Sequence, residues 1–214
     1  MAEIITETPL GPLRGILSKD GSVARFIGIK YATVPARFSH SILDDELSSS
    51  VRDCTQPGKV AVQWQIPASA LAVGKAAWGA VVGGMLPSIP DSQAEQCCFL
   101  NVTAPQSRGG GTPLPVMVWI HGGAFVMGSG SSPLYRSSSL ARRGCVLVTI
   151  NYRLGCFGNL KLPGGDANCG LWDQASSAPM INSALLQRLR RSITSAAPVH
   201  VHMRIPFPAR FAAL

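Results

Sequence analysis

The segment His121-Gly122-Gly123-Ala124-Phe125, with its two adjacent glycines, is the part of this sequence most clearly suited to chemistry. It directly follows the apolar run Val116–Ile120. Glycine lets the backbone turn sharply and come close to a ligand, so that peptide N–H groups can point into a cleft. Such N–H groups stabilise the oxyanion that develops during acyl transfer. The same five residues are also compatible with a glycine-rich turn that binds nothing, so the surrounding segments must decide between the two interpretations.

Acyl transfer also requires a nucleophile, a base and an orienting acid. In many hydrolases the nucleophile is the serine of a Gly-x-Ser-x-Gly turn, and the 214-residue sequence contains no such pentapeptide. The segment Gly128-Ser129-Gly130-Ser131-Ser132 comes nearest, but its spacing is wrong, and we interpret it as a loop that flanks the substrate. His200 and His202 have no serine motif or third ligand nearby, so we assign neither to catalysis or metal binding.

The elements around these residues indicate an α/β fold. Leu13–Ser18 and Ser22–Ile29 are strand-like and separated by a short turn, which predicts an N-terminal β-hairpin region. Val116–Ile120 and Cys145–Ile150 are continuously apolar, as expected for strands covered on both faces. A short helix at about 137–143 would join them, and a βαβ unit of this kind predicts a mostly parallel central sheet.

Five segments in order resemble the type-B carboxylesterase/lipase family, which includes the cholinesterases. They are Gly11–Gly15 with Phe26–Pro35, then Glu95–Val102, Pro115–Phe125, Val148–Gly158 and Gly170–Gln174. Gln96 and Cys98 depart from the family's Glu-Asp-Cys-Leu signature. The resemblance implies that residues 1–174 are the N-terminal part of a carboxylesterase type-B domain, with a partial α/β-hydrolase fold. It also implies a serine acyl-enzyme mechanism that acts on small-molecule carboxylic esters.

This resemblance assigns roles to three residues of the glycine loop. The N–H groups of Gly123 and Ala124 would donate to the oxyanion, and Gly122 would shape the turn. A third donor would follow the nucleophilic serine, for which the sequence has no motif. We therefore expect a family member that stops before the nucleophile and is inactive alone. The alternative is a non-catalytic carboxylesterase-like binding module.

The cysteines and histidines give little indication of a metal site. The sequence contains six cysteines, and the resemblance implies a disulfide between Cys54 and Cys97. Two reduced thiols in an intracellular protein are the alternative. No pair has the spacing of zinc ligands, so we expect neither a metal ion nor a cofactor.

The resemblance further implies two structural ion pairs, Arg37 with Glu95 and Arg153 with Asp173. Their expected role is to fix loops against the sheet, and neither supplies a catalytic acid. If such a pair is buried, removal of one partner leaves an uncompensated charge.

The basic charge is concentrated near the C-terminus. Residues 1–174 contain 14 basic and 11 acidic side chains, whereas residues 175–214 contain five arginines and no acid. The family pattern stops after Gln174, and Pro179 is expected to interrupt the helix that begins there, because proline has no N–H to donate. We interpret 175–214 as a divergent basic tail, produced by a shifted reading frame or a retained intron. The alternative is a basic amphipathic helix around Ile181–Ile193 that would bind membranes or anionic partners.

The composition of the remainder bears on partners and location. No basic stripe with interleaved aromatic residues is present, so we expect no nucleic-acid partner. Glu3 and Glu7 occupy the region where a signal peptide has basic residues, and no apolar run is long enough for a membrane span. We expect a cytoplasmic protein, or a secreted one if a leader precedes this sequence. Without further strands to cover Val116–Ile120, an open sheet edge should promote aggregation or self-association.

Overall fold

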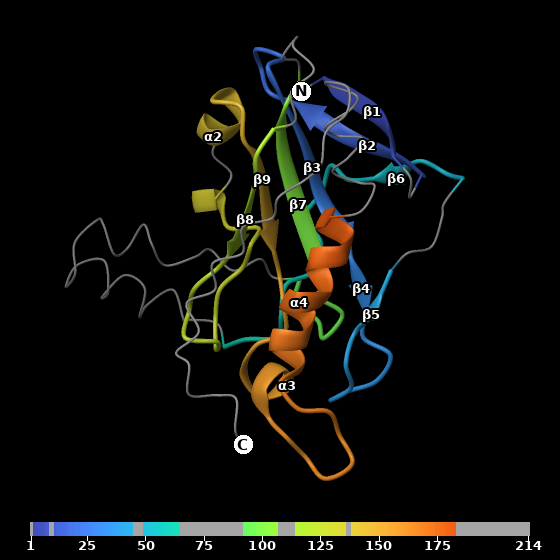
Figure 1. The fold of residues 1–214 in the computed structure, drawn as a ribbon, viewed down its shortest axis with the longest axis vertical. Helices are drawn as coiled ribbons and strands as arrows, with labels where there is room; N and C mark the ends of the chain where they lie inside the picture. Colours follow the sequence, from blue (N-terminus) through green and yellow to red (C-terminus); the bar gives the residue numbers. More distant parts are fainter. Residues whose placement is uncertain are drawn as a thin grey trace, which may run out of the picture.

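The structure, a computed structural model, describes residues 2–8, 11–44, 49–64, 92–106, 114–135 and 138–182. Its strands are β1 (Glu3–Thr8), β2 (Gly11–Leu17), β3 (Val23–Lys30), β4 (Ala32–Thr33), β5 (Ile42–Leu43), β6 (Arg52–Asp53), β7 (Phe99–Pro105), β8 (Val116–Ile120) and β9 (Val146–Ile150). Seven of these strands form one sheet in the order β1-β2-β3-β7-β9-β8, with β6 beside β2 (Figure 1). The pair β4 and β5 forms a separate small sheet.

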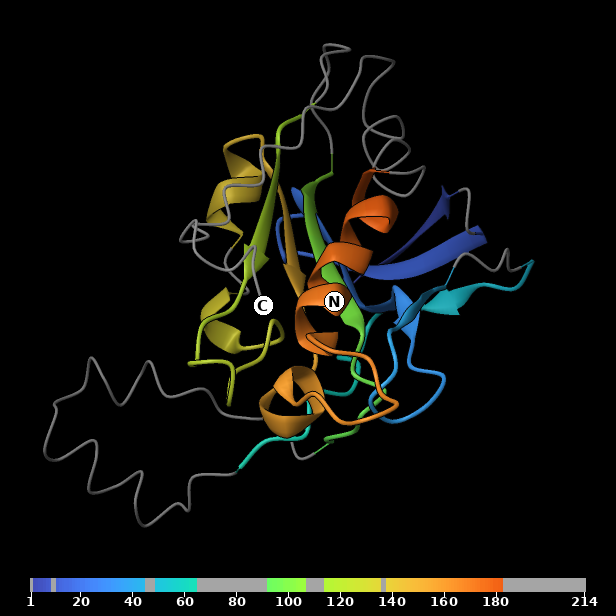
Figure 2. The ribbon, with the colours of Figure 1, turned by 60° about the horizontal axis from the view of Figure 1, so that its bottom comes forward.

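The helices are short except for the last. They are the 3-10 turn η1 (Pro133–Tyr135), α2 (Ser139–Arg142), α3 (Gly155–Asn159) and α4 (Cys169–Asn182). Figures 1 and 2 both show α4 lying across one face of the large sheet, close to β7. None of the helices in the described ranges has the length and apolar character needed to cross a membrane.

The predicted hairpin and the predicted βαβ unit are both present. β2 and β3 pair antiparallel, with Ile16 opposite Arg25. β8 and β9 pair parallel in register from Val116 with Val146 to Ile120 with Ile150, and α2 lies between them in the chain. In the described part of the large sheet, the parallel pairs are β8 with β9 and the short β6 with β2. The other neighbours run antiparallel, and among them β7 lies between β3 and β9 in the opposite direction to both.

The two apolar strands differ in burial. All five residues of β9 are buried, as the sequence predicts. β8 was expected to be equally covered, but its residues are only half-buried and Trp119 is 40% exposed. The reason is position, since β8 is the last strand in the sheet order and its described ladder is with β9 on one side.

The prediction that Pro179 interrupts the helix is wrong, because α4 continues through Pro179 to Asn182. A proline inside a helix costs about 3 kcal/mol. Met180 and Ile181, directly after it, are buried in the main core, and full burial of such side chains contributes about 1.5–3 kcal/mol each. Their burial offsets the proline. Residues 183–214, with most of the amphipathic helix predicted around Ile181–Ile193, lie outside the described residues.

A glycine bulge in β3 connects the hairpin to the centre of the sheet. The register of β3 against β7 shifts between Phe26 and Ile29. Gly28 lies in this shift with φ of 76°, and a Cβ there would be 2.7 Å from the backbone nitrogen of Gly58. The Gly28 N–H donates to Oδ1 of Asn101 at 3.0 Å. The bulge therefore needs both the left-handed conformation and the absence of a side chain.

We predict that Gly28→Ala lowers the free energy of unfolding by about 2–4 kcal/mol, through unfavourable φ and overpacking together. Gly21→Ala is the matched control, because Gly21 also has positive φ but has no atom within 4 Å of an added Cβ. That control should lose about 1–2 kcal/mol, from the backbone conformation alone. Urea denaturation of the two variants measures the difference, and equal losses would contradict a role for crowding at the bulge.

Candidate functional site

The loop that follows β8 begins at a buried histidine. The hydroxyl of Tyr152 donates to the carbonyl oxygen of His121 at 2.9 Å, and the two rings stack with centroids 4.6 Å apart. Burial lowers the pKa of His121 below its usual 6.5, and the hydrogen bond to Gly122 opposes this only partly. The imidazole is therefore neutral at neutral pH. Its Nδ1 lies 3.0 Å from the Gly122 carbonyl oxygen, so the neutral ring carries its proton on Nδ1 and donates it there.

Backbone conformation singles out Gly123 in this loop. Its φ is 133°, and an added Cβ would collide with the carbonyl oxygen of Met127. The carbonyl of Gly123 accepts hydrogen bonds from the N–H groups of Val126 at 3.0 Å and Met127 at 3.1 Å. Gly122, to which the resemblance gives the shaping role, has φ outside the left-handed region and open space around an added Cβ. In this structure the requirement for glycine therefore falls on Gly123.

The two expected oxyanion donors lie at the surface of this turn. Ala124 and Phe125 also have positive φ, 52° and 60°, which side chains with a Cβ rarely adopt. Ala124 is exposed and Gly123 is half-buried. Within the described residues, no acceptor takes a hydrogen bond from the N–H of Gly123 or Ala124. Both donors are therefore available to an external acceptor. The carbonyl of Phe125 accepts from Gly155 N–H at 2.7 Å, which ties the exposed turn to the start of α3.

The second half of the loop is held from beneath by polar side chains of the sheet. Oδ1 of Asn151 accepts hydrogen bonds from Gly130 N–H at 2.7 Å and from the Ser129 hydroxyl at 3.2 Å. The carbonyl of Gly130 accepts from the Thr149 hydroxyl at 2.7 Å and from the Asn101 amide at 3.2 Å. The serine side chains of Gly128–Ser132 are buried, and the segment packs on the sheet. This position differs from the predicted one, in which the segment is a loop that flanks the substrate. The buried serines are Ser129, Ser131 and Ser132.

The pair Arg153 and Asp173 forms a buried, bidentate ion pair. Nε of Arg153 donates to Oδ2 of Asp173 at 2.7 Å and Nη2 donates to Oδ1 at 2.8 Å, with side-chain exposures of 2% and 0%. Nη1 donates to the Ser39 carbonyl at 2.7 Å. Burial disfavours the charge on Arg153, but the hydrogen bonds to Asp173 hold the pKa of the guanidinium above its usual value. The pair thereby joins the end of β9, the segment before β5 and the first turns of α4.

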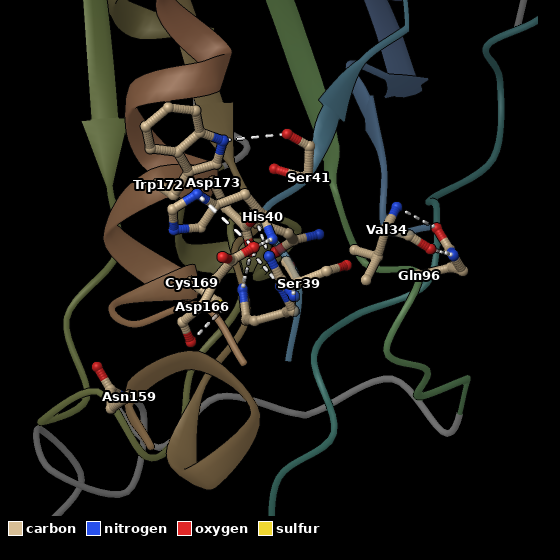
Figure 3. A network of polar contacts seen from close by, with 12 residues as sticks. Val34, Ser39, His40, Ser41, Gln96, Asn159, Asp166, Cys169, Trp172 and Asp173 are labelled. Atoms are coloured by element: carbon tan, nitrogen blue, oxygen red, sulfur yellow. Dashed lines mark hydrogen bonds and ion pairs between the residues drawn. The ribbon is translucent and has the colours of Figure 1, made fainter. Parts of the chain in front are cut away.

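The second pair is different in character. Nε of Arg37 donates to Oε1 of Glu95 at 2.8 Å, but the Arg37 side chain is 62% exposed. Its guanidinium lies 5.3 Å from the centroid of the Phe157 ring. Next to Glu95, the family departure Gln96 uses its amide to accept from Val34 N–H at 3.0 Å and to donate to the Val34 carbonyl (Figure 3). Gln96 thus pairs with both backbone groups of Val34, as a neighbouring strand would.

The thiols of Cys54 and Cys97 are both free and buried in the structure, and the disulfide that the resemblance implies stays a prediction. They belong to different apolar clusters. Cys54 lies in the main core, whereas Cys97 packs with Ala61, Tyr152 and Leu154. Burial raises the pKa of the Cys54 thiol to about 11, which keeps it protonated and unreactive. Over the described ranges, no group of three or more His, Cys, Asp or Glu side chains is arranged to hold a metal ion.

Sequence patterns missed three residues that hold the glycine loop. Tyr152 and Asn151 bind it as described above, and their place beside Arg153 in a family segment was a usable signal. Gln63 is the third, and its amide bonds to both backbone groups of Gly128. It lies 65 positions before Gly128 and outside every segment that carries the resemblance, so no local pattern indicates it.

A glycine-rich turn at the end of a parallel strand, followed by a crossover to the next strand, also occurs in α/β-hydrolases. The described residues form part of that fold. The sequence profile of the carboxylesterase family matches residues 2–184. The chain belongs to the carboxylesterase family.

Individual relatives agree with this assignment. The chain is 37% identical over 185 residues to the para-nitrobenzyl esterase of Bacillus subtilis (strain 168), which covers 83% of this chain and 34% of the relative. It is 33% identical over 193 residues to lipase 1 of Yarrowia lipolytica, and this match covers 86% of this chain and 36% of the lipase. A solved carboxylesterase of Geobacillus stearothermophilus superposes with a TM-score of 0.67 at 30% identity, covering 91% of this chain and 36% of that one. The chain thus spans about a third of the length of these relatives.

We predict that Arg153→Met destabilises the fold by about 3–5 kcal/mol, because Asp173 is then left charged and buried without its partner. Arg37→Met is the control, since an exposed pair contributes about 0–1 kcal/mol. Chemical denaturation at neutral pH measures both. A loss at Arg153 no larger than the loss at Arg37 would show that the buried pair does not hold these segments together.

Proposed function

We propose that this chain supplies the oxyanion-binding part of a serine carboxylic ester hydrolase, with the N–H groups of Gly123 and Ala124 as donors. One observation carries the proposal: the left-handed turn at these residues leaves both N–H groups without an acceptor in the described part of the chain. Donors fixed before the reaction need no reorganisation when charge develops, and loss of one such donor costs about 3–4 kcal/mol of transition-state stabilisation.

The proposed substrate class is a small-molecule carboxylic ester. The relatives include a para-nitrobenzyl esterase, a probable N-octanoylanthranilate hydrolase and lipases. The esterase and lipase names support ester hydrolysis, whereas an N-octanoylanthranilate is an amide, so the names favour no individual substrate.

The 214 residues alone should not turn over esters, because the sequence contains no Gly-x-Ser-x-Gly motif to provide the nucleophile. We expect the purified chain to hydrolyse para-nitrophenyl acetate no faster than a heat-denatured sample. A chimaera tests the loop itself: in the Bacillus subtilis esterase, the aligned N-terminal segment is replaced by residues 2–184 of this chain. We expect the chimaera to hydrolyse the same ester.

Two single substitutions in the chimaera then test the donors. Gly123→Ala forces the turn to change, because an added Cβ collides with Met127, and kcat/KM should fall about 10²–10³-fold. Gly122→Ala is the matched control, since an added Cβ there meets nothing in the described structure. Equal activity of the two variants would overturn the assignment of the donors, whereas ester turnover by the chain alone would overturn the prediction that it is inactive.

We further propose that the edge of β8 promotes self-association. β8 has no charged residue or proline, the features that usually protect a sheet edge. We expect light scattering to find species larger than a monomer, and replacement of the exposed Trp119 by lysine (Trp119→Lys) to shift the distribution toward monomer. Ile42→Lys, which replaces another exposed apolar side chain on β5, is the control and should leave the distribution unchanged. A monodisperse monomer for the unsubstituted chain would contradict the proposal.

A further inference from the structure

Gln63 hydrogen-bonds to both backbone groups of one residue, Gly128, in the loop after β8. Its Oε1 accepts a hydrogen bond from Gly128 N–H at 2.7 Å, and its Nε2 donates to the Gly128 carbonyl at 2.9 Å. The glutamine is itself held in place. Its backbone N–H donates to Oε1 of Gln93 at 2.9 Å, and Nε2 also donates to the Ala61 carbonyl at 3.1 Å. Gln63 is thus held at its backbone N–H and at its side-chain amide by residues outside the loop.

Gly128 packs directly against the first two residues of the loop, His121 and Gly122. Its φ is 122°, and an added Cβ would lie 2.5 Å from the carbonyl oxygen of Gly122 and would also collide with the His121 ring. No side chain fits between these segments, so the Gly128 backbone packs directly on the peptide that precedes Gly123. A displacement of Gly128 is therefore passed to the donors by contact.

We propose that Gln63 is a positioning residue for the oxyanion donors: by fixing Gly128 it fixes the turn that carries the N–H groups of Gly123 and Ala124. It acts through Gly128 and does not touch the substrate. The consequence for catalysis rests on the proposed function above, whereas the effect on loop geometry does not.

The chemistry of the contact requires an amide. Gln63 must accept from one backbone N–H and donate to two carbonyl oxygens, those of Gly128 and Ala61. An ionised carboxylate can accept from Gly128 but would face both carbonyl oxygens without a proton to donate. A protonated carboxyl group restores one donor. Gln63→Glu should therefore hold the loop poorly at neutral pH and better at acidic pH, a response that a loss of packing alone would not produce.

Hydrogen–deuterium exchange on the full 214-residue chain tests the geometry. Gln63→Ala should raise the exchange of peptides covering Val126–Gly128 by about tenfold or more, while exchange within β9 stays unchanged. Gln96→Ala is the matched control, because Gln96 makes the same two-point contact with Val34, on a different segment. That control should leave exchange at Val126–Gly128 unchanged. Gln63→Glu, corrected for the intrinsic pH dependence of exchange, should approach the unsubstituted chain as the pH is lowered.

The catalytic consequence is measured in the chimaera, where Gln63→Ala should lower kcat about tenfold or more and leave KM within about threefold. Unchanged exchange at Val126–Gly128 in both Gln63 variants would overturn the proposal. Increased exchange with an unchanged kcat would also overturn it, because the loop would then move without consequence. A chimaera that is inactive with Gln63 in place would count against the proposed function, and the exchange result would then decide on Gln63.

Discussion

The loop after β8 makes only a few hydrogen bonds within its own backbone, such as those to the Gly123 carbonyl, and side chains from other segments pair with further groups. A buried peptide group without a hydrogen bond is costly, so these groups must be paired with side chains wherever regular ladders end. Asn151 and Thr149 at the end of β9 pair with Gly130 from below. Gln63 pairs with Gly128 from a distant segment. In the described part of the chain, the N–H groups of Gly123 and Ala124 have no acceptor, whereas those of Val126, Met127 and Gly128 are paired.

Electrostatics fixes the layer beside this loop. The Arg153–Asp173 pair is fully buried and its geometry is bidentate, so the hydrogen bonds offset the desolvation of both charges. Around it, His40 stacks on Trp172 at 4.2 Å, and the indole N–H of Trp172 donates to the Ser41 carbonyl at 3.0 Å (Figure 3). These contacts hold α4 to the segment before β5. The exposed Arg37–Glu95 pair is screened by water and has no comparable structural role.

The parts of the fold that depend on local pattern were predictable from the sequence. Alternating and continuous apolar runs indicated the hairpin and β9, and the glycine pair indicated the turn at Gly123. Features that depend on distant segments were not. The half-burial of β8 follows from its place in the sheet, and the passage of α4 through Pro179 follows from burial of the two residues after it. Gln63 acts across 65 positions, so no local pattern indicates it.

The left-handed conformation of Ala124 affects both the stability of the loop and the range of backbone orientations that the loop samples, and the two effects favour different residues. Glycine at this position would remove the steric penalty of φ at 52°, which is of order 1–2 kcal/mol for a residue with a Cβ. It would also enlarge the set of backbone orientations that the peptide samples, which dilutes the fraction of time its N–H is correctly aimed. A methyl group at this place therefore trades stability for a narrower distribution of donor directions. Phe125, with φ of 60°, has the same kind of conformation, so two successive residues share this effect.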